Sequence, residues 1–213
     1  MACCIPSAAI LLVIGLLCAA KRSSLPWKGY WMSLPCNPEG LRRLFLAVWP
    51  ADAECRQLAE LAANVAGRRR VRDANLHLTL VFLDATDAER LAAYETALAG
   101  LMVPTLVLIL DRYGYWPRSR ILWLGCSETP PALVDLVADL HRRLRGCGFS
   151  PEQRAFQAHV TLARNFPGPA PKQAPTASVH WPIEEVALVE SLQGETGSYY
   201  RVVRSWPAGC SGG

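Results

Sequence analysis

The chain has no acidic residue before Glu39, so its formal net charge of +4 is a poor guide to the rest of the sequence. Lys21, Arg22 and Lys28 supply three positive charges, and from residue 37 onward 19 basic residues stand against 18 acidic ones. With a balance of +1, the main part of the chain lacks the general positive field that holds long nucleic acid through counterion release. Its composition, 51% hydrophobic and 19% charged, predicts a folded globular protein instead.

The chain also lacks paired cysteine motifs, although it has eight cysteines. None of them forms a C-x-x-C motif or stands at a Cys/His spacing typical of zinc sites. We therefore expect reduced thiols, as in a cytoplasmic protein, and neither a disulfide framework nor a metal site. Four cysteines belong to the N-terminal stretch and four are scattered singly: Cys3, Cys4, Cys18 and Cys36, then Cys55, Cys126, Cys147 and Cys210.

The uncharged apolar run at residues 5–20 covers 16 positions, fewer than the ~20 that a membrane-spanning helix needs. It also lacks the basic start of a secretory signal, because no charge precedes Lys21. Three interpretations of residues 1–40 remain open: a start assigned too early, with Met32 as the true initiator, a genuine signal or membrane anchor, or another added segment. We accordingly predict an extra segment at 1–40, one two-lobed domain at 41–208 and a tail at 209–213.

Two of the four histidines share a pattern. His77 and His159 are each followed two residues later by a threonine, Thr79 and Thr161, and then by leucine. The neighbours are β-branched, aromatic or aliphatic, which predicts a strand in which residues two apart project from the same face. One such pair is most often a buried structural histidine. Two copies favour a functional site, because burying two imidazoles costs free energy unless both are hydrogen-bonded.

Hydrophobic periodicity predicts an α+β fold of two pseudo-symmetric lobes. Each lobe would consist of antiparallel sheet with helices on the outside, and a central cleft would carry the two His-x-Thr motifs. The aromatic and basic stretch 113–120 is predicted to be a loop, as is the Pro/Gly/Ala-rich stretch 167–178. The run 68–72, with four arginines, fits a solvated loop and a phosphate-attracting rim equally well. Strands are expected at 43–49, 75–83, 105–110, 121–124, 156–164, 183–192 and 199–204, and helices at 51–66, 86–100 and 130–145.

Two facing imidazoles suit the opening of a 2′,3′-cyclic phosphate at an RNA end. Water attacks phosphorus on one side while a ribose oxygen leaves on the other, so the reaction needs a base and an acid. An imidazole with a pKa near ~6.5 serves in either form. The threonine hydroxyls would donate to non-bridging phosphate oxygens in the transition state. No step of this scheme requires a metal. The alternative is a binding module that captures an RNA end or a nucleotide in the same cleft without turnover.

From Arg43 to Trp206 the chain resembles the two-histidine (2H) phosphoesterases, in particular the RNA 2′,3′-cyclic phosphodiesterases also called 2′-5′ RNA ligases. Besides the paired motifs, the resemblance includes the opening strand, the Asn75-Leu76 lead-in, the 116–125 segment and the close around 199–201. It implies hydrolysis to a 2′-phosphomonoester, with ligation as the reverse reaction. It also implies no cofactor, a ligand that is an RNA end or nucleotide with a cyclic phosphate, no obligatory protein partner and a monomer.

The resemblance also assigns roles to individual residues. It implies that His77 donates a proton to the leaving ribose oxygen and that His159 activates water, although the orientation of the substrate decides which histidine is the acid. Thr79 and Thr161 would hold phosphate oxygens. Substrate binding is further implied for two residues, Arg164 and Phe82.

The chain departs from the family pattern at two positions. Ala158 replaces a usual proline before the second histidine, and we expect this to loosen the start of that strand without changing the chemistry. Asp84 replaces a usual glycine after the first motif. Aspartate adopts positive φ less readily than glycine, so we expect a tilted turn that shifts His77 slightly.

Overall fold

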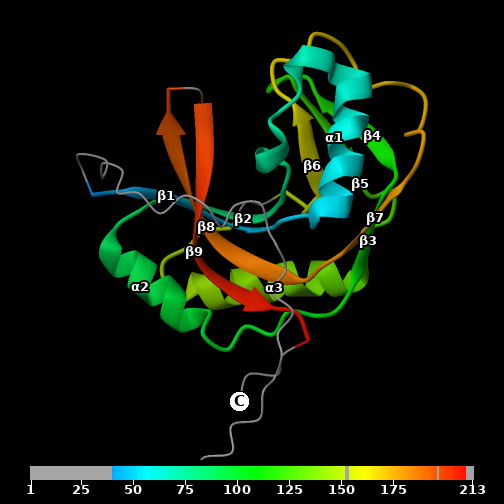
Figure 1. The fold of residues 1–213 in the computed structure, drawn as a ribbon. Coiled ribbons are helices and arrows are strands. Elements are labelled where there is room, and N and C mark those ends of the chain that lie inside the picture. Colours follow the sequence, from blue (N-terminus) through cyan, green and yellow to red (C-terminus); the bar gives the residue numbers. More distant parts are fainter. Residues whose placement is uncertain (1–39, 152–153, 196, 210–213) are drawn as a thin grey trace, which may run out of the picture.

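The computed structural model describes residues 40–151, 154–195 and 197–209. Predictions for residues 1–39 and 210–213, including the alternatives for the N-terminal stretch, lie outside the described residues. Seven strands form one antiparallel sheet in the order β4-β5-β6-β2-β1-β8-β9, and β3 pairs with β7 separately (Figure 1). The strands are β1 Arg42–Val48, β2 Leu78–Thr86, β3 Val107–Leu110, β4 Arg112–Trp116, β5 Ile121–Gly125, β6 His159–Ala163, β7 Val179–Pro182, β8 Glu185–Gly194 and β9 Gly197–Pro207.

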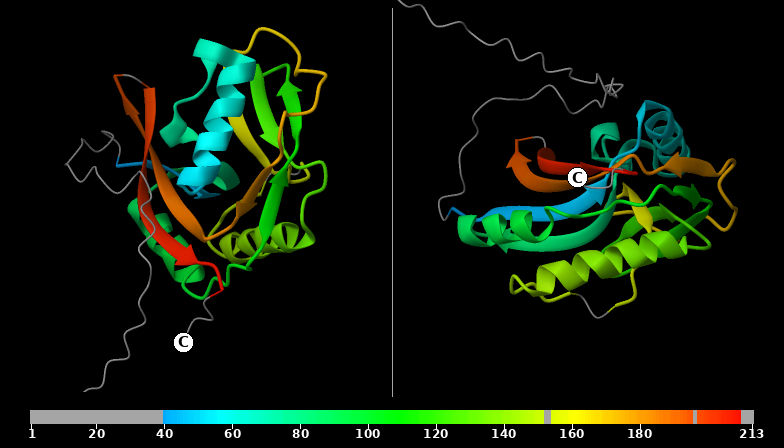
Figure 2. Two further views of the ribbon diagram at one scale, coloured as in Figure 1. Left: turned by 45° about the vertical axis from the view of Figure 1, so that its right-hand side comes forward. Right: turned by 90° about the horizontal axis from the view of Figure 1, so that it is seen from below.

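The predicted α+β architecture of antiparallel strands with helices outside is confirmed, and the two halves are joined within the one sheet. The helices are α1 Asp52–Ala66, α2 Ala88–Ala97 and α3 Pro131–Arg145, with short 3₁₀ turns η1 Gly67–Arg69 and η2 Asp73–Asn75. The helices α2 and α3 lie along one side of the central strands, while α1 stands on the other side beside β6 (Figures 1 and 2). None of the helices in the described part of the chain is long and apolar enough to cross a membrane.

The main core fills the space that the sheet shares with the helices. In α3 the predicted apolar stripe is buried, with Leu133, Leu140 and Leu144 fully inaccessible, because positions three and four apart share one helix face. A second, smaller cluster lies on the opposite face of β1 and β8, where alternate residues point away from the main core. It consists of Phe45, Ala47, Ala187 and Val189. One strand face is therefore committed to packing, and the other carries aromatic side chains.

Several predicted elements differ from those in the structure. The helix predicted from residue 86 begins at Ala88 instead, because Thr86 ends β2 and the Asp87 side chain accepts the capping hydrogen bond from the Arg90 amide. Of the stretch predicted as a loop at 113–120, the first half belongs to strand β4, which gains its backbone partners from β5, and residues 117–120 form a turn. Strand β7 was not predicted, because its four residues become a strand only by pairing with β3.

Candidate active site

The two His-x-Thr motifs lie side by side at the centre of the sheet. Strands β2 and β6 pair antiparallel with Leu78 opposite Val160, and both of these side chains are fully buried in the main core. Extending this register by one residue each way sets His77 opposite Thr161 and Thr79 opposite His159. All four side chains therefore share the face that turns away from the core. The two histidines are diagonal neighbours across the strand pair, a relation in which residues lie about 7–8 Å apart.

Both imidazoles are held in the same way by the backbone just ahead of them. The Nδ1 atom of His77 lies 2.8 Å from the carbonyl oxygen of Asn75, and that of His159 lies 2.8 Å from the carbonyl oxygen of Gln157. A carbonyl can only accept, so Nδ1 carries the proton and donates it in each case. Each Nε2 is then a lone-pair acceptor when the ring is neutral and a donor when it is charged. The geometry thus provides two equivalent groups, each able to give or take a proton.

Aromatic rings enclose His77 on several sides. The indole of Trp49 stacks on it at 4.9 Å between centroids, and the rings of Phe45 and Tyr200 lie at 5.3 and 5.0 Å. Around His159, the ring of Trp116 meets the imidazole edge-on at 4.5 Å. No role for these rings was predicted from the sequence. Alternation along β1 and the aromatic-rich stretch 113–116 were the available signals, but only strand pairing shows which rings meet the histidines.

Burial in this aromatic surrounding lowers the pKa of His77 from 6.5 to about 4. The positive charge of Arg164 and the imidazole of His159 add to this effect, while the hydrogen bond to the Asn75 carbonyl opposes it. Burial, followed by the charge of Arg164, also lowers the pKa of His159. Removing a charged imidazolium from water is unfavourable, so both rings are neutral at pH 7 without a ligand.

Phe82 projects from the same face as the two motifs, because β2 is irregular. The register of β1 and β2 shifts where Leu80 and Leu83 have no opposite partner, so Phe82 stands opposite Phe45 and Thr79 opposite Ala47. Phe82 is 63% exposed, and its ring centroid lies 6.4 Å from that of Phe45. An exposed ring at this place offers a surface on which a nucleobase can stack.

The two departures from the family pattern lie within β2 and immediately before β6. Asp84 adopts φ +58, the left-handed conformation that glycine would provide, and Asp is among the residues that reach it most readily. Ala158 is fully buried immediately before β6, which begins at His159.

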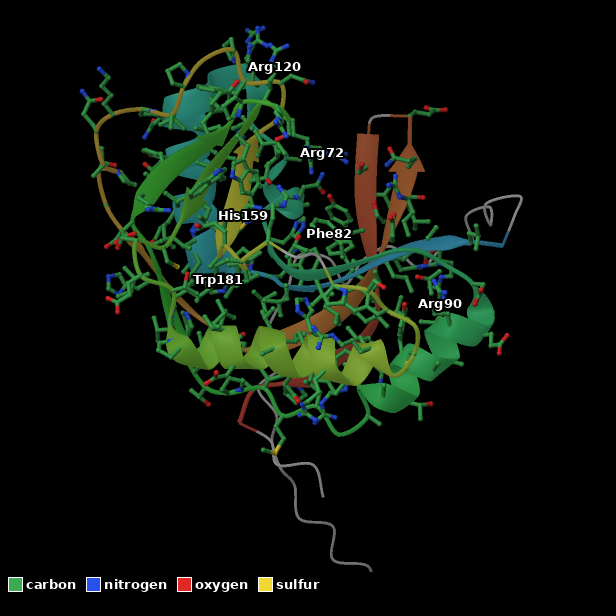
Figure 3. All side chains as sticks on the ribbon, turned by 180° about the vertical axis from the view of Figure 1, so that it is seen from behind. Arg72, Phe82, Arg90, Arg120, His159 and Trp181 are labelled. Atoms are coloured by element: carbon green, nitrogen blue, oxygen red, sulfur yellow. The ribbon has the colours of Figure 1, made fainter. Side chains whose placement is uncertain are left out.

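Arginines gather around one end of the site. Arg164 follows β6 directly and lies near both histidines and the Tyr200 hydroxyl, to which it donates a hydrogen bond. The arginine run is packed against the same end, because Arg70 bridges to Ala163 and Arg69 donates to the Asn165 carbonyl at 3.4 Å. In Figure 3, the labelled His159, Phe82 and Arg72 all lie on the side of the central strands away from α3. The structure thus favours the phosphate-attracting rim for this run.

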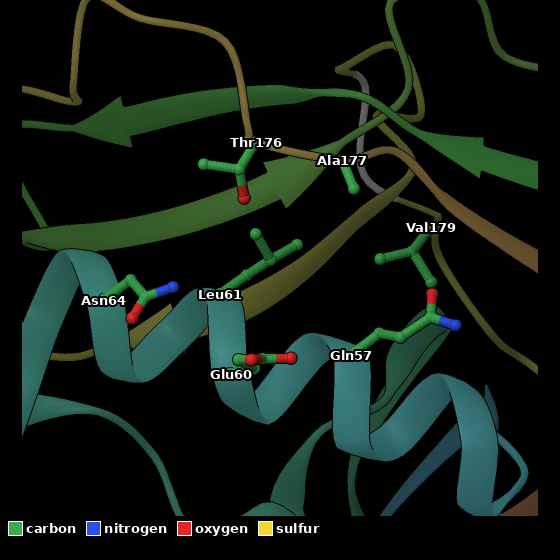
Figure 4. Close-up of a pocket in the computed structure, with 7 residues that line it drawn as sticks. All are labelled: Gln57, Glu60, Leu61, Asn64, Thr176, Ala177 and Val179. Atoms are coloured by element: carbon green, nitrogen blue, oxygen red, sulfur yellow. The ribbon is translucent and has the colours of Figure 1, made fainter.

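The remaining candidates lie elsewhere. Among the described residues, no three His, Cys, Asp or Glu side chains gather closely enough to hold a metal ion. His141 lies on α3 against Phe149, and His180 lies exposed on β7. A hollow beside α1 (Figure 4) contains none of the site residues and is lined by Gln57, Glu60, Leu61, Asn64, Thr176, Ala177 and Val179.

Comparison with known proteins gives consistent matches over most of the chain. A family model described as LigT like phosphoesterase matches twice in succession, at residues 48–123 and 124–197. The RNA 2′,3′-cyclic phosphodiesterase of Escherichia coli (strain K12) is 31% identical over 169 residues, covering 78% of this chain and 96% of the relative. Crystal structures of E. coli LigT in apo form and complexed with 3′-AMP give TM-scores of 0.73 and 0.74 at 28% and 27% identity. These two matches cover 79% and 80% of this chain and 98% and 99% of the solved chains.

Proposed function

The chain belongs to the LigT-like phosphoesterase family, and from this premise we propose that it hydrolyses 2′,3′-cyclic phosphates at RNA ends. The product is a 2′-phosphomonoester, and 2′-5′ ligation is the reverse reaction. The observation that carries the proposal is the pairing of β2 with β6, which sets two Nδ1-anchored imidazoles beside two threonine hydroxyls. The relatives named as RNA 2′,3′-cyclic phosphodiesterases support the reaction, and the structure of LigT with 3′-AMP supports a nucleotide as the ligand class.

In this proposal the cyclic phosphate lies between the two Nε2 atoms. Neutral His159 takes a proton from water as the water attacks phosphorus, and charged His77 gives a proton to the departing ribose oxygen. Thr79 and Thr161, each opposite a histidine, donate to the non-bridging oxygens as negative charge moves onto them. Arg164 adds a positive charge at the same place. The exposed Phe82 ring stacks with the base of the terminal nucleotide.

The acid must acquire its proton when the substrate binds. Both imidazoles are neutral at pH 7 in the unliganded protein, because burial lowers their pKa values. A phosphodiester anion placed between them favours the imidazolium form and therefore raises both pKa values. Once one ring is charged, its positive charge opposes protonation of the other. The bound anion thus selects the state with one acid and one base.

We expect the purified chain to convert a short RNA ending in a 2′,3′-cyclic phosphate to one ending in a 2′-phosphate. The product is identified by mass and by its resistance to enzymes that act only on 3′-phosphates. The reaction should also proceed in an excess of chelator, since the proton transfers are carried by imidazoles. A 3′-phosphate product, no hydrolysis, or loss with chelator that a divalent ion restores would contradict the proposal.

The pH profile should separate the free protein from its complex. The ratio kcat/KM reports the free protein, in which burial lowers the pKa of both histidines below 6.5, that of His77 to about 4. The bell-shaped pH profile of kcat/KM should therefore have its maximum below pH 6.5. The bell for kcat reports the complex and should lie at higher pH, because the phosphate anion raises both pKa values. Rates measured at constant ionic strength test this, and two coincident bells would contradict it.

A further inference from the structure

Asn75 connects the tip of the β8–β9 hairpin to the first histidine. Its backbone carbonyl accepts the hydrogen bond from Nδ1 of His77 at 2.8 Å. Its side-chain amide donates to the carbonyl oxygen of Ser198 at 3.1 Å. Ser198 is the second residue of β9, directly after the hairpin turn. A single residue therefore joins His77 to a part of the chain more than a hundred residues away.

The carbonyl of Asn75 belongs to a short turn, closed by backbone hydrogen bonds from Asn75 N–H to the Arg72 carbonyl at 2.8 Å and from Leu76 N–H to the Asp73 carbonyl at 3.0 Å. Asp73–Asn75 is a single 3₁₀ turn, a structure with poor hydrogen-bond geometry that depends on its surroundings. Neighbouring groups add support: Trp49 donates its indole N–H to the Ala74 carbonyl at 3.5 Å, and Arg72 also donates to Ser198. The hairpin also brings Tyr200 against the His77 ring. Tertiary contacts therefore add to the local hydrogen bonds that orient the Asn75 carbonyl, the acceptor for His77.

His159 is held differently, which makes it an internal control. The Gln157 carbonyl accepts from its Nδ1 at the same 2.8 Å distance. The Gln157 side chain, however, makes no hydrogen bond within the described part of the chain. Removing this side chain leaves the backbone acceptor of His159 as it was. Removing the Asn75 side chain instead takes away the contact with Ser198 that anchors the residue whose carbonyl is the acceptor for His77.

We propose that Asn75 is a positioning residue for His77. Its amide, anchored on Ser198, fixes the carbonyl that keeps the proton on Nδ1 and directs Nε2 toward the substrate. The hairpin tip thereby takes part in setting the tautomer and direction of one of the two proton-transfer groups. The catalytic consequence of this inference rests on the proposed phosphodiesterase function, whereas its structural consequence does not.

The test compares Asn75→Ala with Gln157→Ala in the full chain. Asn75→Ala should lower kcat about 3- to 10-fold, the rate equivalent of one neutral hydrogen bond, with KM within about twofold. The limb of the pH profile that belongs to His77 should move, and that of His159 should stay. Gln157→Ala should leave kcat and both limbs unchanged. Asn75→Leu, which keeps the side-chain shape without the donor, should behave as Asn75→Ala does.

A spectroscopic measurement tests the positioning without turnover. Nitrogen-15 NMR of the histidine rings should show Nδ1–H for both rings in the wild type. In Asn75→Ala it should show mixed tautomers for His77 alone. Unchanged rings and a kcat within twofold in both Asn75 variants would overturn the proposal, as would an equal loss in Gln157→Ala. If the wild type hydrolyses no cyclic phosphate but the His77 tautomer still changes, the proposed function fails and the positioning stands.

Discussion

Replacing either histidine with alanine is expected to lower kcat by roughly 10²–10⁴, the range for loss of one general acid or base. His77→Ala and His159→Ala remove opposite partners of one transition state. The double variant should therefore be little slower than the slower single variant, because groups that act as a unit are strongly non-additive. Nucleotide affinity should stay within about tenfold, since Thr79, Thr161 and Arg164 remain to hold the phosphate.

The pH profiles of these variants provide the control. Each single variant should lose one limb of the bell and keep the other, because one ring must be charged while its partner is neutral. His141→Ala is the matched substitution, since His141 lies on α3 and is not one of the site residues. It should leave both limbs in place. A site variant with near-normal turnover and a complete bell would show that its histidine is structural.

Gly114→Ala is expected to lower the free energy of unfolding by about 1–3 kcal/mol, the usual cost of overpacking. Gly114 on β4 stands opposite Trp123 on β5, and an added Cβ would lie 1.9 Å from the indole ring. The indole is only 6% exposed and has little space in which to move. It must shift, and with it Trp116, whose ring lies 5.6 Å from Trp123 and 4.5 Å from His159.

The same substitution should also lower kcat, because the shift of Trp116 disturbs His159. Urea unfolding measures the loss of stability, and the pH profile of the rate measures the effect on His159. Gly168→Ala is the matched control, because a Cβ there meets nothing within 4 Å. It should change stability by no more than about 1 kcal/mol, with a small gain from the less flexible unfolded chain. Wild-type stability and pH profile in Gly114→Ala would show that the Trp123 indole is not held against Gly114.

The site strands could be predicted from the sequence because their signals are local. Alternation within each His-x-Thr segment predicts that histidine and threonine share a face, and the structure places both pairs on the face away from the core. The apolar stripe of α3 from Leu133 to Leu144 could be predicted equally well, because residues three and four apart lie on one face of a helix. Local sequence signals did not predict β4 and β7. These segments become strands only by pairing with β5 and β3, respectively.

Phe82 shows how a local irregularity changes a prediction. With strict alternation along β2, Phe82, which is three residues after Thr79, would lie on the opposite face and point into the core. The register shift in β2 at Leu80 returns Phe82 to the site face, where it is exposed. A shift of this kind depends on how β1 and β2 fit together, which the β2 sequence alone does not state.

By itself, the sequence determined the chemistry available to this protein: two imidazoles, each beside a hydroxyl on one face of a strand, since that relation is fixed by neighbours two residues apart. Only the tertiary structure decided how these groups are tuned. The pairing of Leu78 with Val160 makes the two motifs one site, and the aromatic rings around His77 lower its pKa to about 4. The amide of Asn75 reaches Ser198 only in the folded chain. Strand pairing and burial depend on contacts between residues far apart in sequence, and no local pattern specifies them.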